Sequence, residues 1–288
     1  MDRKVLRSFS FWYFVVATAL LYLPILLLMV FSFNDSTSLT FPLSGFTLRW
    51  YERLFQSGEL LRSVWNSVAV GVASSLVATA LGTMIAIAVV RYNFPGRGVV
   101  VAVAAMPLVI PYVVLGVALL IAFSQVNIPL SLWTVTAGHV VINIPLVVLI
   151  VAARLIGMEP NLEEAAMDLG ATYWGTLFRV TLPIAFPAMV AAFLTSFTTS
   201  FDEFALAFFL VGPEPTLPVY IFSQLRYPSR LPIVVALAAL IMVASVLLIV
   251  FAEWLRRYGQ QPSRPAEATG RVAERLEPRP LRSAGGVS

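Results

Sequence analysis

The chain contains no cysteine, one histidine and one lysine among its 288 residues. The absence of cysteine excludes disulfides, thiol catalysis, iron–sulfur clusters and cysteine-ligated zinc, and His139 alone cannot build a histidine-rich metal site. The only lysine, Lys4, does not follow a glycine-rich segment, so it cannot serve a P-loop. We therefore expect this chain to bind no metal and no cofactor and to hydrolyse no ATP itself.

Charged residues are also scarce. They make up 12% of the chain against 59% hydrophobic residues, and the mean hydropathy is +0.87. Soluble domains carry about a quarter charged residues, so the composition predicts an all-α membrane protein. A helix needs about 20 mostly apolar residues to cross the hydrocarbon core. Six stretches qualify: Phe11–Phe33, Val64–Val90, Val99–Phe123, Leu132–Leu155, Ile184–Val211 and Pro232–Trp254.

The first apolar stretch follows Arg3, Lys4 and Arg7 and is similar to a secretory signal, with Ala17–Ala19 as a candidate cleavage site. Its apolar character continues to Phe33, however, and the hydrophobic region of a signal sequence spans only about 7–15 residues. We expect residues 1–33 to form an uncleaved signal-anchor helix.

The arginines predict the orientation in the membrane. If the N-terminus is cytoplasmic, 14 of the 19 lysines and arginines fall in inner segments. The other five lie in outer segments: Arg49, Arg53, Arg62, Arg226 and Arg230. Because basic residues concentrate on the cytoplasmic side of membrane proteins, both termini are predicted to be cytoplasmic.

The six stretches divide the chain into four parts. Residues 34–62 form an extracytoplasmic loop, in which the amphipathic stretch Phe46–Tyr51 suits a membrane interface. Residues 63–254 form the core membrane domain, including a cytoplasmic loop at 156–183. Residues 255–288 are rich in proline, arginine, glutamate and alanine, and we expect a disordered cytoplasmic tail, solvated or in contact with membrane lipid.

The loop at 156–183 has the local signals of a helical hairpin. Asn161 can cap a helix, with Glu164 at the spacing of a capping box. Gly170 suits the left-handed position that ends a helix. Thr172 can cap a second helix, and Pro183 is tolerated early in the following span. A connection of this length is long for a membrane bundle, and such loops usually carry function.

The same loop resembles the EAA loop of ABC importer permeases. The family pattern is E-A-A, three residues, G, nine residues, I, one residue, L-P; here it is met by Glu164–Ala166, Gly170 and Leu182–Pro183, with Val180 in place of isoleucine. The resemblance implies a type I importer permease fold (MetI-like) with six transmembrane helices, in the inner membrane of a bacterium. It also implies a coupling surface for the ATPase, made of Glu163, Glu164, Ala165, Ala166, Asp168, Gly170, Leu182 and Pro183.

The resemblance implies partners as well. Such a permease works with a second permease subunit, which we expect to be a different chain, two ATP-binding subunits that use the ATP, and an extracytoplasmic substrate-binding protein; no nucleic acid is implied. The segments Phe46–Tyr51, Trp65–Ser67, Phe201–Phe204 and Thr216–Ile221 resemble the spermidine/putrescine branch of these permeases. Permeases for other small solutes, such as an amino-phosphonate, an opine or a thiamine-like compound, share parts of this pattern.

Asp202 and Glu203 are predicted to lie inside the fifth span, past its midplane. An ionisable group within a membrane segment is costly and often functional, so these two acids, with Asn66 near the outer mouth, are candidates for the substrate path. The alternative is a structural role in binding the partner permease. His139 and Asn143 share one face of the fourth span. We expect hydrogen bonds between helices to satisfy His139, and the alternative is a contact with the pore.

Two other classes of protein remain as alternatives. An intramembrane serine protease would have to use His139 with a membrane serine, and no G-x-S-x-G sequence is present. A stand-alone secondary transporter is expected to show internal repeats and discontinuous helices, and neither is clear in the sequence, although Pro107 and Pro111 are expected to kink the third span.

The orientation can be tested with single cysteines, since the chain has none. A membrane-impermeant maleimide applied to intact cells should label Ser38→Cys and Glu214→Cys but not Thr172→Cys. Labelling of Thr172→Cys in place of Ser38→Cys would show that the chain has the opposite orientation.

Overall fold

The computed structural model describes residues 3–159 and 161–259 and divides the chain into two compact units, 1–237 and 238–288, each considered by itself. The helical elements are α1 (Arg3–Phe31), α2 (Arg49–Gln56), α3 (Gly58–Arg91), α4 (Arg97–Ala105), η1 (Met106–Leu108), α5 (Tyr112–Gln125), α6 (Leu132–Ile156), α7 (Asn161–Asp168), α8 (Tyr173–Thr176), η2 (Leu177–Thr181), α9 (Leu182–Asp202), α10 (Ala207–Leu210), α11 (Leu217–Gln224), η3 (Pro228–Arg230) and α12 (Leu231–Gly259). Over the described residues the only bridge between extended segments is an isolated one, Asn34 to Phe46.

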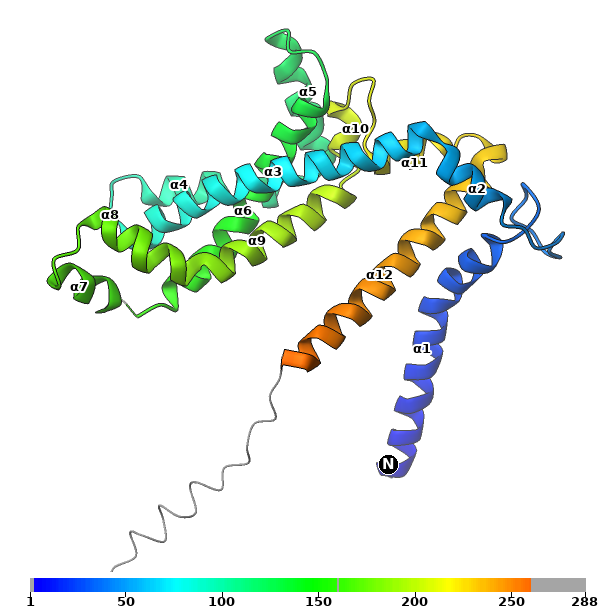
Figure 1. Ribbon diagram of the computed structural model, residues 1–288, viewed down its shortest axis with the longest axis horizontal. Helices are drawn as coiled ribbons and strands as arrows, with labels where there is room; N and C mark the ends of the chain where they lie inside the picture. Colours follow the sequence, from blue (N-terminus) through cyan, green and yellow to red (C-terminus); the bar gives the residue numbers. More distant parts are fainter. Residues whose placement is uncertain (1–2, 160, 260–288) are drawn as a thin grey trace, which may run out of the picture. The chain divides into compact units, whose positions relative to one another are not determined.

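Helices α3, α6 and α9 pack side by side at the centre of the first unit (Figure 1). Small residues allow this close approach, as is usual between membrane helices. A Cβ added to Gly82 of α3 would lie 2.7 Å from Val147 of α6. A Cβ on Gly138 of α6 would lie 2.6 Å from the side chains of Leu206 and Leu210. Larger residues at these two glycines would therefore push the helices apart.

The loop between α1 and α3 has buried side chains and hydrogen bonds of its own. Trp50 of α2 is buried, and its indole N–H donates to the carbonyl of Asn34 at 2.8 Å. The hydroxyl of Tyr51 donates to that of Ser32 at 2.7 Å. Ser57 ends α2 and caps α3, accepting from the N–H of Leu60 at 3.4 Å. Trp50 belongs to the amphipathic stretch that was expected at the membrane interface. In the structure it stabilises the loop instead.

The third apolar stretch is broken. Helix α4 runs into η1, which contains Pro107, and α5 begins directly after Pro111 at a bend of 107°. Neither proline has a backbone N–H to continue a helical ladder, so the expected kink is a complete break. In the part of the chain that the structure describes, five helices can cross a membrane, or six if this bent pair forms one span.

The fifth span ends earlier than predicted. Helix α9 stops at Asp202 and Glu203 has extended backbone (φ −72°, ψ 120°). The chain then forms the short helices α10 and α11. The prediction of one helix over Ile184–Val211, with both acids inside it, was therefore wrong: the acids lie at the break.

The segment after the break is tied to the bundle by polar contacts. The Asn66 side-chain nitrogen on α3 donates to the carbonyl of Pro215 at 3.0 Å. The Thr134 hydroxyl on α6 donates to the carbonyl of Leu210 at 2.7 Å. These bonds satisfy carbonyls that lie outside regular helix, which is the condition for irregular backbone at membrane depth.

The loop at 156–183 forms the predicted hairpin. Gly170 ends α7 with φ +88°, and the Thr172 hydroxyl accepts from the N–H of Gly175 at 3.2 Å as the cap of α8. Pro183 lies at the start of α9, after the π-helical turn η2. Asn161 is the first residue of α7 and not the cap before it. Helix α12 continues to Gly259, and residues 260–288 of the predicted tail at 255–288 lie outside the described residues.

Candidate functional site

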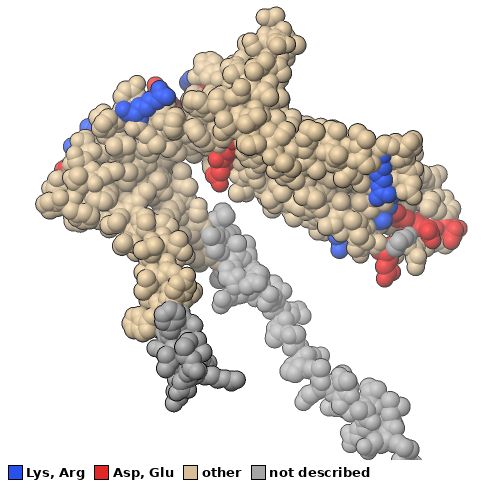
Figure 2. All heavy atoms as spheres, turned by 180° about the vertical axis from the view of Figure 1, so that it is seen from behind, with Lys and Arg blue, Asp and Glu red and all other residues tan. Residues whose placement is uncertain are grey.

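The hairpin presents an exposed apolar surface at one end of the bundle. Leu169 is 90% exposed and Trp174 is 64% exposed. The ring of Trp174 stacks on that of Phe178, which is exposed as well, with centroids 6.2 Å apart. Acidic and basic side chains gather at the same end of the molecule (Figure 2). Apolar surface rimmed by charge is typical of a protein-binding site, so the hairpin has the surface that docking on a partner requires.

The predicted coupling residues divide by exposure. Half-buried are Glu163, Ala166 and Leu182; exposed are Glu164, Ala165, Asp168, Gly170 and Pro183. The turn η2, which directly precedes Leu182–Pro183, packs against α7.

Glu163 is turned toward the bundle. Arg91 Nε at the end of α3 lies 3.1 Å from each carboxylate oxygen of Glu163. The Thr181 hydroxyl of η2 donates to Glu163 Oε1 at 2.7 Å. Both charged side chains are less than one-fifth exposed. Charge-assisted bonds of this kind are among the stronger ones in proteins, so Glu163 joins the hairpin to α3 and to the start of α9.

Glu203, at the break after α9, is 6% exposed. Its Oε1 accepts from the N–H of Leu206 at 2.8 Å, and its Oε2 accepts from the N–H of Ala207 at 2.9 Å. Free N–H groups at the start of a helix favour a carboxylate. Glu203 is therefore the acceptor that allows α10 to begin, and its two oxygens are occupied.

His139 of α6 closes the network around Glu203. Its Nε2 lies 3.3 Å from Glu203 Oε2, and its Nδ1 lies 2.6 Å from the hydroxyl of Ser200 on α9. The Ser200 hydroxyl is 3.0 Å from that of Ser74 on α3. In the tautomer that carries its proton on Nε2, beside the carboxylate, Nδ1 accepts from the Ser200 hydroxyl. The prediction that bonds between helices satisfy His139 is confirmed for Nδ1. Asn143, by contrast, has no side-chain hydrogen bond within the described residues.

Asp202 differs from its neighbour in being exposed. No ion pair or side-chain hydrogen bond of Asp202 is present among the described residues. Asn66, the third candidate for the substrate path, is buried and uses its nitrogen on Pro215. The two adjacent acids therefore differ. Both oxygens of Glu203 accept hydrogen bonds from the chain itself, and the Asp202 carboxylate is exposed and available to a ligand.

Sequence reasoning missed Arg91, Thr181, Ser200 and Ser74. Arg91 and Glu163 are 72 positions apart, and Ser74 and Ser200 are 126 apart, so no local spacing links them. The sequence offers only a weaker indication of these contacts. A charged or hydroxyl side chain on a helix that also carries small residues often lies at a helix–helix interface.

The sequence was compared with known proteins. The family described as "Binding-protein-dependent transport system inner membrane component" matches residues 78–258. The spermidine/putrescine transport system permease protein PotC of Haemophilus influenzae is 36% identical over 259 residues, 89% of this chain and 98% of that protein. The putrescine transport system permease protein PotI of Escherichia coli is 34% identical over 242 residues, 81% of this chain and 85% of that protein.

Two solved structures have a similar fold. A chain of a bacterial ABC transporter involved in the import of alginate has a TM-score of 0.68 at 18% identity, covering 90% of this chain and 99% of that one. A chain of the MetNI methionine ABC transporter has a TM-score of 0.56 at 22% identity, covering 70% of this chain and 96% of that one.

The Glu163 contacts can be tested by local opening of the hairpin. Glu163→Ala removes the acceptor of both Arg91 and Thr181, so amide hydrogen exchange over residues 161–168 should accelerate about tenfold, the effect of losing about 1.4 kcal/mol. Glu164→Ala, one position along and exposed, is the matched control and should change exchange little. Equal acceleration in the two variants would mean that Glu163 does not anchor the hairpin.

Proposed function

Because the chain belongs to the family of inner-membrane components of binding-protein-dependent transport systems, we propose that it is the permease subunit of an ATP-driven importer of polyamines. It forms half of the translocation pore, and a second permease subunit forms the other half. Two ATP-binding subunits supply the energy, and an extracytoplasmic binding protein delivers the substrate. The chain itself is not catalytic and binds no cofactor.

The open carboxylate of Asp202 carries the substrate assignment. A polyamine leaving water needs a counter-charge, since an unpaired cation in a low-dielectric environment is prohibitively costly. Asp202 is exposed at the break of α9, whereas both oxygens of Glu203 accept backbone hydrogen bonds. Phe204, Phe208 and Phe222 form an aromatic cluster next to the break, with ring centroids 4.8–5.7 Å apart. Aromatic faces attract cations, although phenylalanine does so weakly. The names of PotC and PotI add support from the relatives.

The hairpin carries the coupling to ATP. Its exposed apolar residues suit docking on the ATPase. Glu163 connects a movement of the hairpin to α3 through Arg91, and to α9 through Thr181 of η2. The exposed Glu164 and Asp168 lie on α7, where they are free to meet that subunit. In this mechanism the closing of the ATPases moves the hairpin, and α9 carries the movement to the break that holds Asp202.

The proposal is tested in the assembled transporter in liposomes, with its binding protein present. Asp202→Asn should lower spermidine uptake at least tenfold and putrescine uptake less, because more charge is left uncompensated in spermidine. ATP hydrolysis stimulated by the loaded binding protein should persist. Glu52→Gln, which neutralises an exposed carboxylate on α2, is the matched control.

Two outcomes would contradict the proposal. Undiminished spermidine uptake by Asp202→Asn would remove this residue from the substrate path. Uptake by the wild-type transporter that follows an ion gradient without ATP would identify a secondary transporter, for which the break between α4 and α5 is the discontinuity expected.

A further inference from the structure

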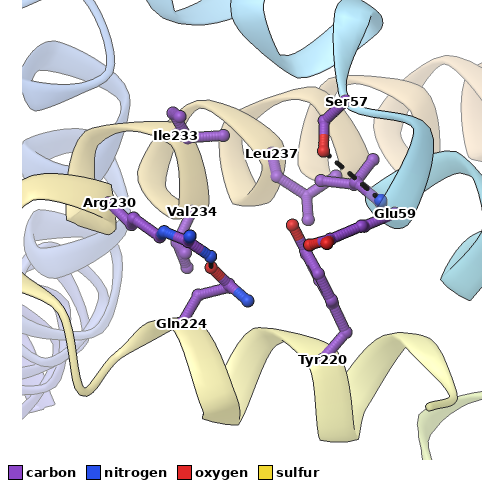
Figure 3. Close-up of a pocket in the computed structure, with 9 residues that line it drawn as sticks. Ser57, Glu59, Tyr220, Gln224, Arg230, Ile233, Val234 and Leu237 are labelled. Carbon is purple, nitrogen blue, oxygen red and sulfur yellow. Dashed lines mark hydrogen bonds between the residues drawn. The ribbon is translucent and has the colours of Figure 1, made fainter. Parts of the chain in front are cut away.

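A cavity on the outer side of the first unit lies between the beginning of α3 and α11. It has a volume of about 650 Å³, and Asn66, Glu59, Glu214 and Tyr220 are among its lining residues. Binding sites for small molecules usually enclose about 300–1,000 Å³. A smaller cavity of about 170 Å³ adjoins it and shares Glu59 and Tyr220 (Figure 3). This region is distinct from Asp202, which lines neither cavity.

Two buried polar side chains point into the cavity with unused acceptors. Tyr220 is 8% exposed, and its side chain rises from α11 toward Glu59 (Figure 3). Its hydroxyl makes no hydrogen bond to any described residue. Asn66 is 4% exposed; its nitrogen donates to Pro215, while its Oδ1 accepts nothing from the described chain. Each side chain is more than nine-tenths buried and still has an oxygen on the cavity wall that can accept a hydrogen bond from a bound ligand.

The charges around the cavity favour a cation. Glu59 and Glu214 are both exposed carboxylates, and neither forms an ion pair in the described structure. Arg62 is the one basic residue on the wall of the larger cavity. Arg230, beside the smaller cavity, is already engaged: its Nη1 donates to Gln224 Oε1 at 2.6 Å, and its guanidinium lies 5.3 Å from the ring centroid of Tyr227. The larger cavity therefore has a formal charge of −1, with free acceptors.

We propose that this cavity is an entry site for the substrate, at which ammonium groups of an arriving polyamine are held before they reach Asp202. The proposal rests on the polyamine assignment above and adds a second site to it. Glu59 and Glu214 pair with two ammonium groups of the same molecule. The Tyr220 hydroxyl and Asn66 Oδ1 accept further N–H bonds, and the face of the Tyr220 ring attracts the cation. An anion would meet two carboxylates here.

Because Asn66 also holds Pro215, the site adjoins the segment between α10 and α11. That segment follows α10, the short helix that comes after the break at Glu203. A polyamine bound to Glu214 would contact the same segment, whose residues Pro213 and Pro215 form part of the cavity wall. One short stretch of chain therefore connects the proposed entry site with Asp202.

The test uses two residues of opposite charge, Glu59 and Arg62, which lie about one helical turn apart on α3. The assembled transporter in liposomes is given saturating, spermidine-loaded binding protein, and initial uptake of spermidine and putrescine is measured. Glu59→Gln combined with Glu214→Gln should lower spermidine uptake about fivefold or more, and putrescine uptake less. Arg62→Gln, which removes the repulsive charge from the same wall, should raise uptake, and Glu52→Gln, an exposed acid outside both cavities, is the matched control. ATP hydrolysis stimulated by the binding protein should stay near the wild-type value in all variants.

The remaining outcomes overturn the entry site. Wild-type uptake in the double variant would show that the two carboxylates hold no substrate. A parallel loss of uptake and of stimulated ATP hydrolysis, in Arg62→Gln as in the double variant, would instead identify a docking surface for the binding protein. Failure of the wild-type transporter to move any polyamine is a different result, since it refutes the proposed function before the entry site is tested.

Discussion

A carboxylate buried among packed membrane helices needs hydrogen-bond donors. The groups around Glu203 come from two parts of the chain. The N–H groups of Leu206 and Ala207 bind its two oxygens, and His139 of α6 lies beside Oε2. Through Ser200 and Ser74 the same network reaches α9 and α3. The arrangement of the three central helices and the break after Asp202 therefore depend on one buried acid.

The break in turn determines what the neighbouring residue can do. If α9 continued through Val211, as the apolar sequence predicts, adjacent acids would point about 100° apart on one helix. Instead the helix ends at Asp202, and the following segment returns along α3 and α6. Thr134 and Ser67 satisfy its backbone: the Thr134 hydroxyl donates to the Leu210 carbonyl, and the Ser67 hydroxyl accepts from the N–H of Leu217 at 2.8 Å. Glu203 accepts the backbone donors at the start of α10, and Asp202 is exposed without a side-chain hydrogen bond in the described structure.

Local rules predicted much of this protein. The hairpin follows from capping residues and from Gly170 in its left-handed conformation, and the spacing of the EAA pattern identified the family that the comparisons show. The apolar stretches also located the spans, with the third broken at its prolines. The end of α9 could not be predicted in this way, because mostly apolar sequence continues on both sides of the pair Asp202–Glu203 and the partner of Glu203, His139, is far away in sequence. The bond between Arg91 and Glu163 could not be predicted either, because these residues are also far apart in sequence.

The central claim is that Glu203 is a structural acid and Asp202 is a functional one. It is tested most directly by a double-mutant cycle on Glu203→Gln and His139→Gln, followed as thermal unfolding of the assembled complex in detergent. We predict that each single variant is destabilised, that uptake of every substrate falls alike, and that the two changes are coupled by about 1–2 kcal/mol. Additive effects, or a stable Glu203→Gln complex that loses spermidine uptake selectively, would contradict the account.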